Sequence, residues 1–123
     1  MMKGQVYWIR NFPADDPSRQ GEIEKQVVVL QNHTMFPRKK RTTVVLTTTN
    51  LVGREAPWNV FVGAGTFDPW KSDCVIQCGD IFSWIVAELT DEKLSVYKGT
   101  LPDEVMTRVD VALAVSLSLG RGA

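Results

Sequence analysis

The sequence has little of what metal sites, disulfide frameworks and membrane spans require. It contains one histidine and two cysteines in 123 residues and no Cys-x-x-C motif, so we expect no metal-ligand cluster and no cofactor. Cys74 and Cys78 lie four residues apart in a strand-like run, which separates their Cα atoms by roughly 13 Å. A disulfide needs less than about 7 Å. Both thiols are therefore expected to be reduced and buried.

Long apolar runs and a surplus of one charge are also absent. No apolar stretch approaches the roughly 18 residues of a membrane-spanning helix, and Met1-Met2-Lys3-Gly4 passes directly into a strand pattern instead of a signal peptide. The sequence thus predicts a cytoplasmic protein that does not contact a membrane. Fourteen basic and fourteen acidic side chains cancel, so any hold on nucleic acid must come from local clusters of charge.

What the chain does have is the length and apolar content of one domain. With 123 residues and 44% hydrophobic side chains, residues 1–123 are expected to form a single core. Strand patterns with turn residues between them recur along the chain and suggest a small barrel. We expect strands at Gln5–Arg10, Gln26–Gln31, Thr42–Thr49, Trp58–Val62 and Cys74–Cys78, and weaker ones at Ser83–Ala87 and Leu94–Lys98.

The last segment has helical periodicity instead. Val105, Val109 and Ala112 recur at the spacing of one helix face. Pro102 suits the first turn of this helix, and Gly120 is a suitable stop.

Two of the strand segments end in polar residues suited to a site. They are EKQVVVLQN, from Glu24 to Asn32, and TTVVLTTTN, from Thr42 to Asn50. Both resemble the core of the MazF/PemK (Kid) family of toxin endoribonucleases. The resemblance starts at Gly4-Gln5-Val6-Tyr7-Trp8, which is similar to the family's opening G-[DE]-[VI]-[YW] strand. It ends at Met106 to Leu119, which is similar to the family's closing helix, and so covers nearly the whole chain.

The resemblance implies both a fold and a function. The fold is an SH3-like β-barrel of the MazF/PemK/CcdB type with a long C-terminal α-helix, built as a homodimer with grooves at the subunit boundary. The function is that of the toxin of a toxin–antitoxin system, a sequence-selective, metal-independent endoribonuclease that leaves a 2',3'-cyclic phosphate and a 5'-hydroxyl. Its partners would be single-stranded RNA and a cognate antitoxin that occupies the same groove.

Two residues are candidates for catalysis under this resemblance. Thr48 matches the family's catalytic threonine, and Lys25 stands where the family's Arg-Pro pattern has its main catalytic arginine. If the two segments pair as neighbouring strands, Lys25 and Thr48 approach each other. Lysine supplies positive charge to a phosphate but not the bidentate fork of arginine. The structural alternative is a solvated strand-end lysine and an ordinary strand threonine.

Further residues are expected to contact the substrate. Thr49 matches the serine that follows the family's threonine, and Gln77 stands where Kid-like members have an arginine. Trp58 aligns with an aromatic that lines the family's RNA groove, and Asp73 is expected to be a further substrate contact. Trp70 lies in Asp68-Pro69-Trp70-Lys71, which is typical of an exposed turn, and is a second candidate for base stacking.

Two segments without apolar periodicity complete the expected site. Asn11–Gly21 carries two prolines and a glycine and suggests an exposed flap over the site. Arg38-Lys39-Lys40-Arg41 is the densest basic run and suggests a hairpin tip close to the cleft, with Arg38, Lys39 and Arg41 on RNA phosphates. The alternative for this run is a solvated loop that maintains solubility.

Two other functions stay open. Gln77, Gly79 and Phe82 stand where the resemblance implies arginine, aspartate and arginine, which favours a degenerate member that binds RNA or an antitoxin-like peptide without cutting. Gyrase inhibition as by CcdB would need that family's Trp-Gly-Ile chain end. This chain ends at Leu119-Gly120-Arg121-Gly122-Ala123, so this alternative ranks last.

Overall fold

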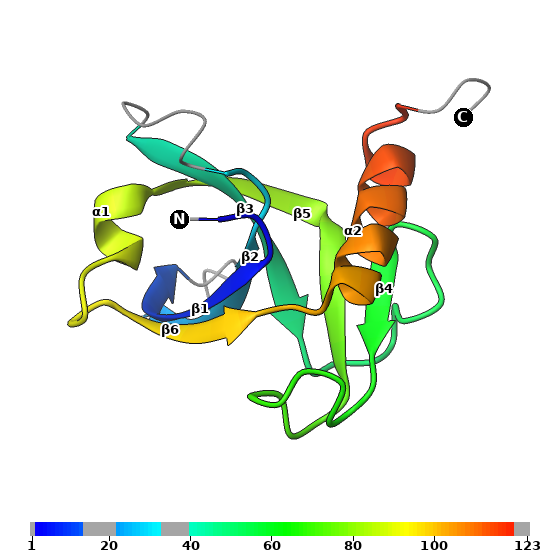
Figure 1. Cartoon of the computed structure of the whole chain (residues 1–123), viewed down its shortest axis with the longest axis horizontal. Coiled ribbons are helices and arrows are strands. Elements are labelled where there is room, and N and C mark those ends of the chain that lie inside the picture. Colours follow the sequence, from blue (N-terminus) through cyan, green and yellow to red (C-terminus); the bar gives the residue numbers. More distant parts are fainter. Residues whose placement is uncertain (1, 14–21, 33–39, 120–123) are drawn as a thin grey trace.

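The computed structural model describes residues 2–13, 22–32 and 40–119, and within them the chain is mainly β with a C-terminal helix (Figure 1). The predicted fold class is confirmed. The elements are β1 Gln5–Pro13, β2 Glu22–Val29, β3 Arg41–Thr48, β4 Asn59–Val62, β5 Cys74–Ile85, α1 Val86–Leu89, β6 Ser95–Thr100 and α2 Asp103–Ser116.

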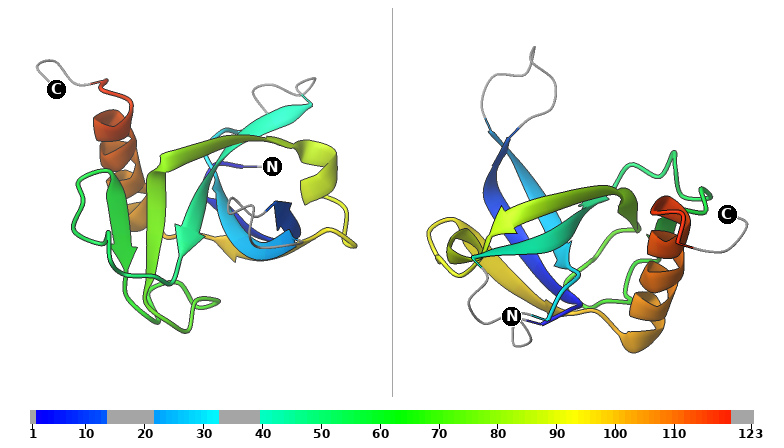
Figure 2. Two further views of the ribbon diagram at one scale, coloured as in Figure 1. Left: turned by 180° about the vertical axis from the view of Figure 1, so that it is seen from behind. Right: turned by 90° about the horizontal axis from the view of Figure 1, so that it is seen from above.

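The strands form one antiparallel sheet with the order β4-β5-β3-β2-β1-β6. The two strands with polar ends, β2 and β3, pair directly near the middle of this sheet, as the sequence predicts. The sheet bends strongly, so that α2 lies beside β4 and β5 while α1 lies at the opposite end of the molecule (Figures 1 and 2). The middle strands β2 and β3 are therefore covered by other parts of the chain on both faces.

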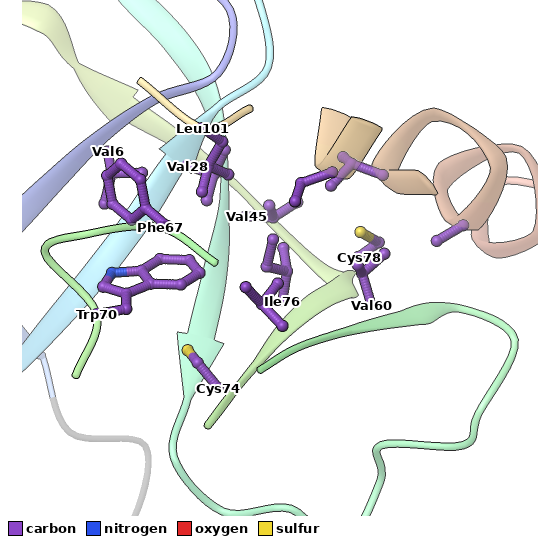
Figure 3. Packing of buried hydrophobic residues seen from close by; sticks show 14 residues of the cluster. Val6, Val28, Val45, Val60, Phe67, Trp70, Cys74, Ile76, Cys78 and Leu101 are labelled. Atoms are coloured by element: carbon purple, nitrogen blue, oxygen red, sulfur yellow. The ribbon is translucent and has the colours of Figure 1, made fainter. Parts of the chain in front are cut away.

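This arrangement explains the continuous apolar runs of β2 and β3. Successive strand residues point to opposite faces of a sheet, yet Val27, Val28 and Val29 are all fully buried. Val28 packs with Val45 in the core cluster that includes residues of α2 (Figure 3). Val27 and Val29 pack with Val44 in a second cluster on the other face. Strands covered on both faces need no polar alternation.

The predicted C-terminal helix is present as α2. Its buried residues Val105, Val109 and Ala112 face the sheet at a spacing of one or two turns. Asp103 and Glu104 lie in its first turn, where negative charge complements the helix dipole. The predicted stop at Gly120 lies outside the described residues. In the part of the chain that the structure describes, no helix is long and apolar enough to cross a membrane.

Several elements differ in their bounds from the predicted ones; β2, for example, runs from Glu22 to Val29 instead of from Gln26 to Gln31. β1 continues to Pro13, because Phe12 and Pro13 pair with β2, so only 14–21 of the expected flap is left, and it lies outside the described residues. β5 runs for 12 residues to Ile85, past a register shift opposite β3. The expected strand at Ser83–Ala87 is thus divided between β5 and the short helix α1. Cys74 and Cys78 are free and buried, as predicted.

Candidate functional site

A cleft of about 340 Å³ opens where β1, β2 and β3 meet the segment that leads into β5. Its walls come from Trp8 of β1, Lys25 and Gln26 of β2, residues 47–49 at the end of β3, residues 69–72, and Cys74. The lining is mostly polar, although the strands that carry it are apolar a few residues further along. A polar cleft at strand ends is a place where the chain can change its chemistry without changing its core.

The two predicted catalytic residues meet at this cleft. In the β2–β3 ladder Val28 pairs with Val45 and Val27 with Leu46, and Lys25 and Thr48 lie beyond this last pair and both line the cleft. The Thr47 hydroxyl donates a hydrogen bond of 2.9 Å to the Gln26 carbonyl, which holds the strands together at this point. Lys25 and Thr48 thus line the same cleft, and their catalytic roles stay a prediction.

Thr48 and Lys25 both interact with neighbouring groups. Thr48 Oγ1 accepts a bond of 3.0 Å from the backbone N–H of Asn50, which leaves its own proton to be donated elsewhere. Burial raises the pKa of the Cys74 thiol, while a hydrogen bond with Thr47 and the positive charge of Lys25 act in the opposite direction. The positive charge of Lys25 is thus felt by the Cys74 thiol, which belongs to the lining of the cleft.

Trp70 is a wall of the cleft and not an exposed turn residue, so that prediction is wrong. Only 4% of Trp70 is exposed, and its ring meets that of Phe67 edge-on at 5.1 Å between centroids (Figure 3). Its indole N–H donates a hydrogen bond of 2.6 Å to the side-chain oxygen of Gln26. The Asp68-Pro69-Trp70-Lys71 pattern indicates the turn correctly but not the inward direction of its tryptophan.

Gln77 lies on the other side of Thr48, in a second hollow of about 120 Å³. This hollow is lined by Thr48 and Gln77 together with Asn59, whose side chain donates a bond of 2.9 Å to the Gly53 carbonyl. Gln77 pairs with Leu46 on β3 and with Asn59 on β4. Thr48 therefore belongs to both hollows and connects Gln77 to the cleft of Lys25.

Of the remaining predicted contacts Thr49, Asp73 and Trp58, one lines the cleft. Thr49 is exposed and lines it. Asp73 is exposed, but its carboxylate accepts a bond of 2.8 Å from the N–H of Ala64 and so closes a turn. Trp58 is 48% exposed and lies against Gly79, where an added Cβ would be 3.3 Å from its ring. Neither Asp73 nor Trp58 is among the cleft residues.

The basic run is only partly described. Arg38 and Lys39 lie outside the described residues. Arg41 begins β3, and its guanidinium donates bonds of 2.9 and 3.2 Å to the hydroxyl and carbonyl of Ser83. Thr48 ends the same strand, so roughly 23 Å of extended chain separates the two. The expected position close to the cleft is therefore not found for Arg41 within this chain.

Sequence reasoning missed part of the cleft wall. Trp8 was recognised only as part of the opening strand motif, and Gln26 only as a departure from the Arg-Pro pattern. Arg10 and Lys98 lie over the Trp8 ring, with the Arg10 Cζ at 4.7 Å and the Lys98 Nζ at 5.8 Å from its centroid. The signal for Trp8 and Arg10 was their alternation with buried Tyr7 and Ile9. Lys98 needed the pairing of β6 with β1.

The structure is thus a small, mainly β fold in which the ends of two strands bring a cation and a hydroxyl to one polar cleft. Such a cleft suits an anionic ligand. A family model described as PemK-like, MazF-like toxin of type II toxin–antitoxin system matches residues 2–117. The chain therefore belongs to the PemK-like, MazF-like toxin family.

The fold is also shared with solved structures. An endoribonuclease in complex with its cognate antitoxin from a mycobacterial species has a TM-score of 0.72 and 22% identity, with 98% of each chain covered. A MazE–MazF crystal structure from Deinococcus radiodurans gives 0.71 and 18%, with 98% and 97% covered. The Mycobacterium tuberculosis toxin MazF-mt6 gives 0.68 and 16%, with 95% and 99% covered. No curated protein matches the sequence.

Proposed function

We propose that the cleft cuts single-stranded RNA and that Lys25 and Thr48 carry the reaction. The observation behind this proposal is that adjacent strands bring a cation and a hydroxyl to one polar cleft. The family description, toxin of a type II toxin–antitoxin system, supports it. Two solved structures with a similar fold are endoribonucleases from mycobacterial species, which supports it further.

The proposed reaction uses the RNA's own 2'-hydroxyl. Its oxygen attacks the adjacent phosphorus, the bond from phosphorus to the 5'-oxygen breaks, and the products are a 2',3'-cyclic phosphate and a 5'-hydroxyl. One proton leaves the 2'-hydroxyl, and one reaches the departing 5'-oxygen. Lys25 stabilises the negative charge that grows on the phosphorane oxygens, and the Thr48 hydroxyl donates a hydrogen bond to one of them. Thr49 and Gln77 contact the nucleotides on either side.

A second candidate function is binding of RNA without cutting. It is favoured because the described residues that line the cleft include no carboxylate and no imidazole, the groups that most often act as general acid and base. In this case Lys25 would bind a phosphate and no bond would break.

The deciding experiment is cleavage of a long single-stranded RNA in EDTA with mapping of both product ends. Lys25→Ala and Thr48→Ala are compared with Lys3→Ala, whose ammonium pairs with Asp110 on α2 at 2.7 Å and takes no part in the cleft. We expect cutting that survives EDTA, falls in the two cleft variants and persists in the control. No cutting by folded wild type that still binds RNA would establish the second candidate.

We further propose two protein partners. An antitoxin is expected because relatives were solved as complexes with one. A second copy of the chain is expected because α2 and the residues after it expose Val111, Val115 and Leu119 at 63%, 42% and 71%. Sedimentation of wild type against Val111→Glu tests the homodimer. A wild type that sediments as a monomer across the micromolar range would contradict it.

A further inference from the structure

We propose that Trp8, Arg10 and Lys98 form a phosphate-binding subsite that carries the RNA strand from the cleft toward the β6 edge of the sheet. This inference rests on the proposed function, because it names where a part of the same substrate lies. The three residues come from β1 and β6 and are defined together as the Trp8 cluster.

The sheet register builds a continuous track from the cleft to this cluster. Trp8 pairs with Gln26 on β2 and with Val96 on β6, and Gln26 is bonded through its carbonyl to Thr47 on β3. These residues form one row across four neighbouring strands. At about 4.8 Å per strand the row spans roughly 14 Å, and Trp8 itself lines the cleft.

The cluster concentrates positive charge beside that row. The Arg10 guanidinium and the Lys98 ammonium both lie over the Trp8 ring, at 4.7 and 5.8 Å from its centroid. Cations are attracted to an indole face. The β1–β6 register sets Arg10 and Lys98 on opposite sides of Trp8 along the strands, so each of them can pair with one phosphate of the RNA backbone. Trp8 thus orders two long side chains before the ligand arrives.

The position of the cluster favours an extended polyanion over a single small anion. Lys25 supplies positive charge inside the cleft, and Arg10 on β1 and Lys98 on β6 supply it on either side of Trp8. Successive phosphates of one strand match such spaced cations, as in grooves that track single-stranded nucleic acid. The binding of single strands by several such contacts is strongly dependent on salt.

The experiment measures binding of a fluorescent single-stranded RNA with methylated 2'-hydroxyls, which cannot be cut, at a series of salt concentrations. The variants are Arg10→Gln with Lys98→Gln, and Lys3→Gln as a control that also removes one cation. Each lost phosphate contact lowers the slope of log affinity against log salt by about 0.7. We expect the double variant to lower the slope by about 1.4, the control to leave it unchanged, and Lys98→Arg to retain it.

Substrate length gives a second test. Shortening the RNA by single nucleotides from each end should abolish the difference between wild type and double variant from one end only, the end that reaches β6. An unchanged slope in a folded double variant would overturn the proposal. A double variant that no longer binds a poly-glutamate peptide but binds RNA as well as wild type does would also overturn it. The expected slopes together with no cutting of an unmethylated RNA would overturn only the nuclease. Cutting by wild type with unchanged slopes would overturn only the subsite.

Discussion

The indole N–H of Trp70 donates a hydrogen bond of 2.6 Å to the side-chain oxygen of Gln26, which joins residues 69–72 to the middle of the sheet. Gln26 follows Lys25 directly, so this bond also supports the strand that presents the cation. The residue that replaces the proline of the Arg-Pro pattern therefore has a structural task in this chain.

Breaking this bond should cost stability through a coupling between the two residues. We expect Gln26→Leu and Trp70→Phe each to destabilise the fold, and the double variant to lose about 1 kcal/mol less than the sum of the two. Urea unfolding of the four proteins measures this. Strictly additive losses would mean that the bond contributes nothing in solution.

Lys25→Arg should increase RNA cutting. Arginine offers a planar fork that binds two phosphate oxygens, whereas lysine offers a single ammonium. We expect a gain of about tenfold for Lys25→Arg, and a loss of about 100-fold for Lys25→Gln, the range seen when one preorganised charge donor is removed. Single-turnover cleavage rates measure both. Equal rates for all three proteins would remove Lys25 from the reaction.

Thr42 and Thr47 form a matched pair for testing a buried hydroxyl. Both are buried, at 2% and 5% exposure. The Thr42 hydroxyl has no hydrogen-bond partner among the described residues, whereas that of Thr47 donates to Gln26. Thr42→Val should stabilise the protein by about 1 kcal/mol and Thr47→Val should destabilise it by a similar amount. Equal effects in urea unfolding would contradict the assignment.

Alkaline conditions should weaken the fold through Cys78. Burial and then the charge of Asp110 raise the pKa of its thiol to about 12. Between about pH 9 and that value the unfolded chain releases this proton while the folded chain keeps it. Stability is then fully present below pH 9 and falls by up to about 1.4 kcal/mol per pH unit above it. The Cys78→Ala variant should show a shallower fall in urea unfolding from pH 8 to pH 11, and parallel curves would contradict this.

The sequence predicted the strand pair and the closing helix because their signals are local. The runs around Val27–Val29 and Val44–Leu46 and the spacing of Val105 and Val109 depend only on which faces are buried. A period of two or 3.6 residues indicates these features directly. Thr48 and Lys25 were instead predicted from the resemblance to the MazF/PemK family.

The rest depended on contacts between distant segments. Trp70 turns inward because Gln26, 44 residues away, offers its indole an acceptor. Lys98 reaches Trp8 only because β6 pairs with β1, and its strand pattern was weak. The length of β5 was missed because a register shift opposite Val45 and Leu46 interrupts its alternation.

The burial of β2 and β3 on both faces has a consequence for how this chain can vary. Their interiors tolerate little change, because each valine there packs against a full core. Lys25 and Thr48 lie just beyond those interiors, at half-buried positions where a substitution leaves no cavity. The buried residues that tolerate little change and the residues that determine the chemistry of the cleft thus lie only one or two positions apart on the same strand. The chemistry of the cleft can therefore change one residue at a time while the two packed cores stay intact.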